Sequence, residues 1–162
     1  MAIAVVTTGP ALVRVDTGAS NALEDLGYSV DGVQIIERTF ISDVYGDQNG
    51  GTDGPPIELQ YMGQVDTVRM ELSKFDDAVV DKIRPRLYGG TLGSSGTAGT
   101  LIAAGSLGFR LLIEPTTDPR NYLFAIPREP IEVNRGTKRS LLIMEWECHA
   151  NASSVLWNAT TT

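Results

Sequence analysis

The stretch Asp66-Thr-Val-Arg-Met-Glu-Leu72 decides the fold class, because its side chains change polarity at every residue. Val68, Met70 and Leu72 share one face of an extended chain, and the residues between them are polar. This alternation is typical of a strand with one face on a core and the other in water. It therefore predicts an antiparallel sheet, around which the rest of the chain can be interpreted.

The same alternation recurs on both sides of this strand. Upstream, Ile57–Tyr61 alternates in the same way, and we interpret Gly63 and Gln64, between the two runs, as a hairpin turn. Near the C-terminus, Leu142–His149 predicts a long strand with one dry face. Further strands are expected at 2–6, 11–15, 33–42, 108–114, 121–126 and 131–133. The chain is thus predicted to be mainly β, an antiparallel β-sandwich or open barrel.

One segment has helical spacing instead. Phe75, Val79 and Ile83 recur at intervals of four residues and predict one amphipathic helix, at about 74–84, packed against a sheet. Ser73 is a suitable N-cap for this helix.

The helix is expected to end before Pro85, since a proline disfavours the helical conformation of the residue before it. A second, short helical turn is expected at Asn21–Leu26, closed by Gly27. Two glycine-rich stretches predict long loops: an extended loop at 45–56 and a flexible, uncharged loop at 89–100.

Length and composition fit a single domain over residues 1–162 and exclude several classes of function. The chain has 13 Lys and Arg against 20 Asp and Glu, a net charge of −7, which disfavours binding to nucleic-acid phosphates. Cys148 and His149 are the only residues of their types, so we expect neither a disulfide nor a metal or cofactor site. In a strand the two neighbours point to opposite faces, so we expect Cys148 in the core and His149 at a surface. Neither a membrane span nor a secretory signal is expected.

One short motif suggests an enzyme. Asp16-Thr-Gly-Ala19 follows a predicted strand and resembles the catalytic loop of retroviral-type aspartic proteases. That chemistry needs two carboxylates about 3 Å apart, so a single copy would act only in a homodimer through Asp16. The alternative is ordinary turn chemistry after a strand. We expect no catalytic activity and keep the protease as an alternative hypothesis.

The order of the parts resembles the tail tube proteins of tailed bacteriophages. The resemblance is carried by Leu26–Val33 leading into Gln34–Ser42, by Gly63–Ile83, and by Ile126–Cys148. It implies a virion structural protein whose rings, expected to be hexamers, stack into the DNA conduit of the tail. It further implies self-association, contacts with other virion proteins, assembly in the host cytoplasm and no sequence-specific binding of nucleic acid. A capsid decoration or neck protein is the remaining alternative.

Two sets of site residues follow from this resemblance. The loop at 45–56 would be the ring-stacking hairpin, and its candidate contact residues are Tyr45, Gly46, Asp47, Gln48, Asn49 and Asp53. A conduit must let DNA pass without adhesion, so its lumen should present carboxylates. The polar faces and ends of the predicted strands offer five candidate lumen acids: Glu58, Asp66, Glu71, Glu145 and Glu147.

Overall fold

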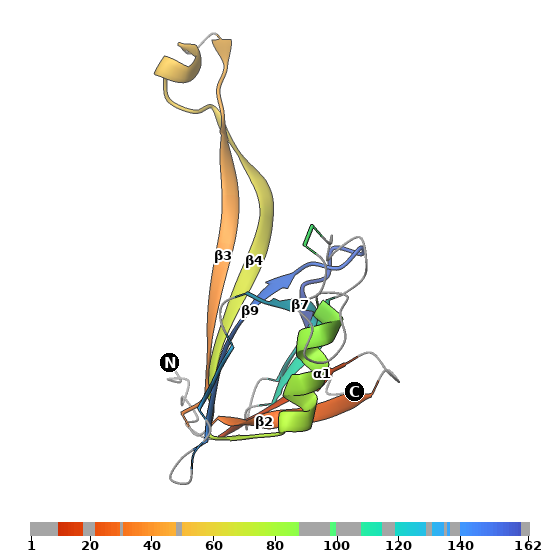
Figure 1. Ribbon diagram of the computed structural model, residues 1–162. Helices are drawn as coiled ribbons and strands as arrows, with labels where there is room; N and C mark the ends of the chain where they lie inside the picture. The colour runs from red at the N-terminus through yellow and green to blue at the C-terminus, as the bar shows by residue number, and fades with distance from the viewer. Residues whose placement is uncertain are drawn as a thin grey trace, which may run out of the picture.

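The computed structural model describes residues 10–17, 22–29, 31–47, 50–87, 98–99, 108–114, 119–128, 131–134, 136 and 140–159. Within these ranges the chain forms one ten-stranded antiparallel sheet and one α-helix (Figure 1). The elements are β1 (Ala11–Asp16), β2 (Leu23–Ser29), β3 (Val33–Val44), η2 (Gly51–Asp53), β4 (Glu58–Leu72), β5 (Lys74–Phe75), α1 (Asp77–Leu87), β6 (Phe109–Glu114), β7 (Arg120–Pro127), β8 (Glu132–Asn134), β9 (Leu141–His149) and β10 (Trp157–Asn158). The predicted mainly antiparallel β fold with a single helix is confirmed, and the choice between a sandwich and an open barrel stays a prediction.

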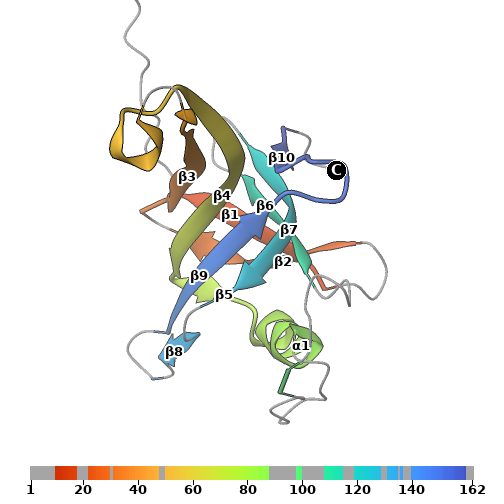
Figure 2. The same ribbon diagram turned by 90° about the horizontal axis from the view of Figure 1, so that it is seen from above.

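The sheet curls on itself, because β4 connects its two ends. The strand order is β3-β4-β9-β7-β6-β1-β2-β5, with β10 added to β7 and β8 added to β9. β4 is second in this order and β5 is last, yet only Ser73 separates them in the chain. The Ser73 amide donates to the Tyr28 carbonyl of β2 at 3.1 Å, so the ends of the sheet meet here (Figure 2).

The core fills the inner face of this curled sheet. On β4 the predicted dry face is confirmed, since Val68, Met70 and Leu72 are at most 3% exposed. β9 pairs with β4 and adds its own apolar face to the core. The ring of Trp146 on this face meets that of Phe109 edge-on, with centroids 5.8 Å apart. The alternating residues of β9 are Leu142, Met144, Trp146 and Cys148, all buried. Burying each such side chain stabilises the fold by roughly 1.5–3 kcal/mol.

The helix begins three residues later than predicted. Lys74 and Phe75 pair with β2 as the short strand β5, so they are not available to a helix. Asp76 is the N-cap in place of Ser73: its Oδ1 accepts a hydrogen bond from the Ala78 amide at 2.9 Å. α1 then packs on the sheet through Val79, Val80 and Ile83, all at most 4% exposed.

Three further predictions about local structure are wrong. The helix does not end before Pro85 but continues to Leu87, because a proline removes one amide hydrogen bond without forbidding the last turn. The segment Asn21–Leu26 does not form a helical turn: from Leu23 onward the chain is strand β2, paired with β1. There, pairing with β1 overrides the local turn signal.

The predicted turn at Gly63 and Gln64 is also wrong, because β4 runs through both residues as one strand of 15 residues. Gly63 instead forms a β-bulge, and the pairing between β3 and β4 shifts by one residue beside Phe40. The hairpin turn lies further out, within the predicted loop at 45–56. The predicted strand at 2–6 lies outside the described residues, and so does the loop at 89–100 apart from a turn at 98–99.

The anchoring of α1 gives a stability prediction. Replacing Ile83, which is fully buried, by alanine is expected to lower the free energy of unfolding by about 2–4 kcal/mol, because it leaves a cavity under the helix. Lys82→Ala is the control on the same turn: it removes only an exposed ion pair to Glu24 and should cost less than about 1 kcal/mol. Chemical denaturation measures both, and equal losses would contradict this account of helix packing.

Candidate assembly surface on a projecting arm

A two-stranded arm extends from the body of the protein (Figure 1). β4 pairs with β9 only from Asp66 to Leu72. From Glu58 to Val65 its sole partner among the described strands is β3. At about 3.3 Å per residue, this stretch carries the tip roughly 25 Å beyond the last pair with β9. We call residues 38–65 the arm, and a two-stranded ribbon of this kind is marginally stable in water by itself.

One face of the arm continues the core face of the sheet. Directly opposed residues of an antiparallel pair lie on the same face, and Ile35 opposite Val68 lies on the core face. Following β3 outward by two residues at a time leads from this pair to Ile41, which opposes Tyr61. We call the apolar residues of this continuation the apolar stripe; they are Ile41, Tyr45, Ile57, Leu59 and Tyr61.

No described segment of the chain covers this stripe. Ile41, Ile57, Leu59 and Tyr61 are 57–64% exposed. Of the nine large apolar side chains exposed among the described residues, seven lie on the arm, so the exposure is concentrated there and not scattered. Concentrated exposed apolar surface marks an interaction site. The sequence predicted these residues as strand positions but gave no sign that they would lie beyond the core.

The bulge at Gly63 lies where the arm leaves the body. Gly63 has a φ of 124°, a conformation that side-chain-bearing residues rarely adopt. A Cβ at this position would meet nothing within 4 Å, so the glycine is required by its backbone angle and not by crowding.

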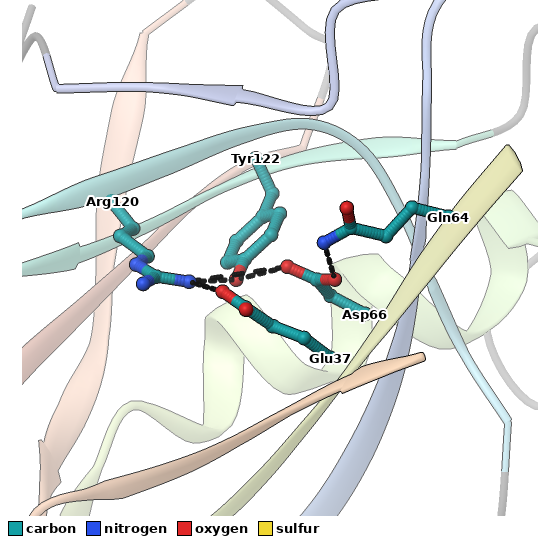
Figure 3. Close-up of polar contacts among 5 residues, drawn as sticks. All are labelled: Glu37, Gln64, Asp66, Arg120 and Tyr122. Carbon is teal, nitrogen blue, oxygen red and sulfur yellow. Dashed lines mark hydrogen bonds and ion pairs between the residues drawn. The ribbon is translucent and has the colours of Figure 1, made fainter. Parts of the chain in front are cut away.

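A cluster of polar side chains lies between β4 and β7, close to the point where the arm leaves the body (Figure 3). Asp66 is fully buried, and its two oxygens accept hydrogen bonds from the Tyr122 hydroxyl at 3.0 Å and from Gln64 Nε2 at 2.9 Å. Arg120 Nη1 donates to Glu37 Oε1 of β3 at 2.7 Å and lies 4.0 Å from Asp66 Oδ2. We call these five residues the exit cluster.

Two further features define the exit cluster. Burial raises the pKa of the Tyr122 phenol well above its ordinary value, and the adjacent Arg120 offsets only part of this, so the hydroxyl keeps the proton that it donates to Asp66. The Arg120 guanidinium also lies 4.6 Å from the centroid of the Trp157 ring, which adds a cation–π contact. Sequence reasoning missed this cluster because its members come from strands far apart in the chain.

The structure places four of the five candidate lumen acids on one face. Glu71, Glu145 and Glu147 lie on the outer face of β4 and β9, opposite the core, and Glu58 continues that face on the arm. Asp66 does not belong to this set: it is fully buried and in phase with Val68, Met70 and Leu72, so it cannot line a surface of the protomer. The sequence held this signal, because the spacing from Asp66 to Val68 is two residues.

The outer face is not a bare wall of carboxylates. Arg69 Nε lies 2.6 Å from Glu145 Oε2, and Arg128 Nε lies 3.0 Å from Glu147 Oε2. His149 lies on the same outer face of β9, and its Nε2 contacts the other oxygen of Glu147 at 2.7 Å. Cations thus accompany two of the acids, which lowers the negative field that the face presents.

The predicted stacking residues lie at the tip of the arm. Tyr45, Gly46 and Asp47 follow β3, and Asp53 ends the 3-10 turn η2. The Gly51 amide donates to the Gly46 carbonyl at 3.3 Å, so the tip folds back on itself. Gln48 and Asn49 lie outside the described residues.

The residues that the sequence suggested for catalysis or metal binding lie in the body of the protein and not on the arm. Asp16 is the last residue of β1 and is 9% exposed, and residues 18–20 of its loop lie outside the described residues. Cys148 lies in the core as expected, where burial raises the pKa of its thiol. Among the described residues, no three acids, cysteines or histidines approach closely enough to bind a metal ion.

No model of a known protein family matches the chain, and no curated protein matches it. Within the described residues, no helix has the length and apolar character that a membrane span requires.

The bulge gives a prediction about the arm alone. Gly63→Ala should strain the backbone by about 1–3 kcal/mol, and the arm should relieve this strain by losing β3–β4 pairing beyond the bulge. Hydrogen exchange of the amides of residues 39–44 and 58–62 should therefore accelerate.

Gly32→Ala is the matched control, since Gly32 also has a positive φ, 84°, and open space, but lies between β2 and β3. It should leave exchange in the arm unchanged. Equal acceleration in both variants would mean that the bulge does not control the arm.

Proposed function

We propose that this chain is a structural subunit of the tail-tube type, which self-associates through its arm into stacked rings that form a DNA conduit. One observation carries the proposal: the apolar stripe continues the core face of the sheet beyond the end of the protein's own core. Such a face is complementary to another apolar surface, and a second copy of the chain supplies one at every position of a homo-oligomer.

The edges of the sheet support the same proposal. β3 is the first strand in the sheet order, and over its 12 residues β4 is its sole partner among the described strands. At the other end, β2 is covered by β5 over only Gly27 and Tyr28. The edges that these described strands leave unpaired differ from each other, so they can pair head-to-tail, and such an interface gives a ring when its rotation closes.

Charge supports the outer face of β4 and β9 as the wall of the conduit. Glu58, Glu71, Glu145 and Glu147 share this face, and the chain carries a net charge of −7. The arginines of the same face that contact Glu145 and Glu147 are already paired, so they are poor partners for phosphates. A ring that repeats this face would repel DNA over about 10 Å at physiological salt.

The stripe can be tested by one substitution with a control on the same strand. Leu59→Ser removes an apolar side chain from the stripe, whereas Gln60→Ser changes an exposed residue on the opposite face of β4. Leu59→Ser should leave the melting temperature unchanged and raise the protein concentration needed for assembly by about tenfold or more. Gln60→Ser should assemble like the wild type.

Negative-stain electron micrographs and sedimentation velocity measure this outcome. Wild-type protein should form rings or tubes. A wild type that stays monomeric at high concentration, or a Leu59→Ser variant that assembles normally, would overturn the proposal. Regular particles without a central channel would instead favour a decoration protein.

The electrostatic part has its own test. In a low-salt anisotropy titration, the wild type should bind duplex DNA no better than a generic acidic protein. The double variant Glu58→Lys and Glu71→Lys should bind measurably, with an affinity that falls steeply as salt is added. Tight, salt-sensitive binding by the wild type would contradict a repulsive lumen.

A further inference from the structure

We propose that the exit cluster fixes the direction in which the arm leaves the body, with Arg120 as the positioning residue that ties β3 to β7. The inference deepens the proposed function and rests on it in one respect, namely that the arm is the element through which copies associate.

The cluster lies where β9 no longer connects β4 to β7. β9 separates β4 from β7 in the strand order, but it ends at His149, which opposes Phe124 of β7. Beyond that level the edge of β7 that β9 leaves pairs with the two-residue strand β10, at Asn121 and Tyr122, and no described strand pairs with both β4 and β7. Side chains make the connection instead: Tyr122 reaches Asp66 from β7, and Arg120 reaches Glu37 on β3.

The ion pair between Arg120 and Glu37 matters for β3 more than for any other strand. Among the described strands, β3 pairs with β4 alone, so backbone hydrogen bonds attach it to the body on one side only. Arg120 provides a second attachment from across the curled sheet, and the Trp157 ring at 4.6 Å restricts the plane of its guanidinium. β3 is therefore held at the base of the arm, by β4 on one side and by Arg120 of β7 on the other.

Burial makes the arrangement selective for one arm direction. A carboxylate as buried as that of Asp66 is costly unless hydrogen bonds and a cation accompany it. Gln64 and Asp66 belong to β4, whereas Tyr122 and Arg120 belong to β7. A swing of the arm away from β7 would separate Asp66 from Tyr122 and Arg120 and leave its buried carboxylate with the Gln64 hydrogen bond alone, so directions other than the observed one are penalised.

A fixed arm would also promote association. Ordering a flexible segment at an interface costs free energy, and a segment already held in its bound direction avoids that cost. Loss of the cluster should therefore raise the concentration needed for assembly while leaving the apolar stripe itself intact.

The test measures arm direction in the single protomer. Spin labels are placed at the tip through Thr52→Cys and on α1 through Ala78→Cys, both at exposed positions. Cys148 is buried and its thiol pKa is raised, so it does not compete for the label. Labelled protein is diluted into an excess of unlabelled protein, and pulsed electron resonance gives the distribution of label-to-label distances.

Glu37→Ala is the decisive variant, because Glu37 is half exposed and its loss does not threaten the body. It should broaden the distance distribution about twofold, with an unchanged melting temperature. Arg120→Met should broaden it at least as much, and Glu37→Gln, which keeps a hydrogen-bond acceptor, should fall between Glu37→Ala and the wild type. Glu145→Ala is the control: it removes an ion pair of 2.6 Å on the outer face, away from the exit, and should leave the distribution narrow.

The outcomes separate the two proposals. A distribution that stays narrow in Glu37→Ala, or one that is already broad in the wild type, overturns the role of the exit cluster whether or not the protein assembles. If Arg120→Met fails to fold, Glu37→Ala decides alone. A narrow wild-type distribution that broadens in Glu37→Ala, in a protein that never forms rings or tubes, would retain the positioning role and overturn the proposed function.

Discussion

The inner face of β4 passes from the buried core into solvent along a single strand. Between Asp66 and Leu72 this face is buried against β9 and the rest of the core, and the apolar residues there stabilise the protomer. Beyond Gly63 the same face carries Leu59 and Tyr61 into solvent. This apolar face, which extends beyond the core, is the constraint on which the rest of the structure depends, because it leaves apolar surface that no described segment of the chain covers.

The boundary between these two environments is marked by residues that suit neither a core nor an interface. A buried carboxylate, Asp66, ends the core, and a glycine with a positive φ, Gly63, begins the arm. The carboxylate requires partners, and β7 supplies them through Tyr122 and Arg120. Folding energy and arm direction are thus coupled at one level of the sheet, while the apolar stripe further out stays exposed.

Period-two alternation predicted the fold class well, because burial of one sheet face leaves its mark on every second residue. The dry faces of 66–72 and 142–148 and the hairpin loop at 45–56 follow from that rule. The errors arose where pairing partners decide the outcome. Gly63 has turn chemistry but lies in a bulge, Asn21–Leu26 has helical chemistry but pairs with β1 from Leu23, and Lys74 and Phe75 pair with β2.

The candidate site was harder to predict than the fold. The tip residues and four outer-face acids could be chosen because a loop and a polar strand face are local properties. That Ile57, Leu59 and Tyr61 are exposed could not be predicted, since an apolar residue in an alternating run has the same pattern whether its own core or another subunit covers it. The exit cluster joins residues more than 50 positions apart, Asp66 with Tyr122 and Glu37 with Arg120, and no local pattern records such a contact.

The continuity of β4 has a mechanical consequence. A single run of chain connects the tip of the arm, through β4 and Ser73, to β5 at the opposite end of the sheet. A pull along the arm would act parallel to β4, so the seven residue pairs from Asp66–Cys148 to Leu72–Leu142 would resist together in shear. A pull across the arm would instead open these pairs one after another, starting from Asp66–Cys148. The protomer should therefore be stiff to tension along the arm and compliant to bending across it.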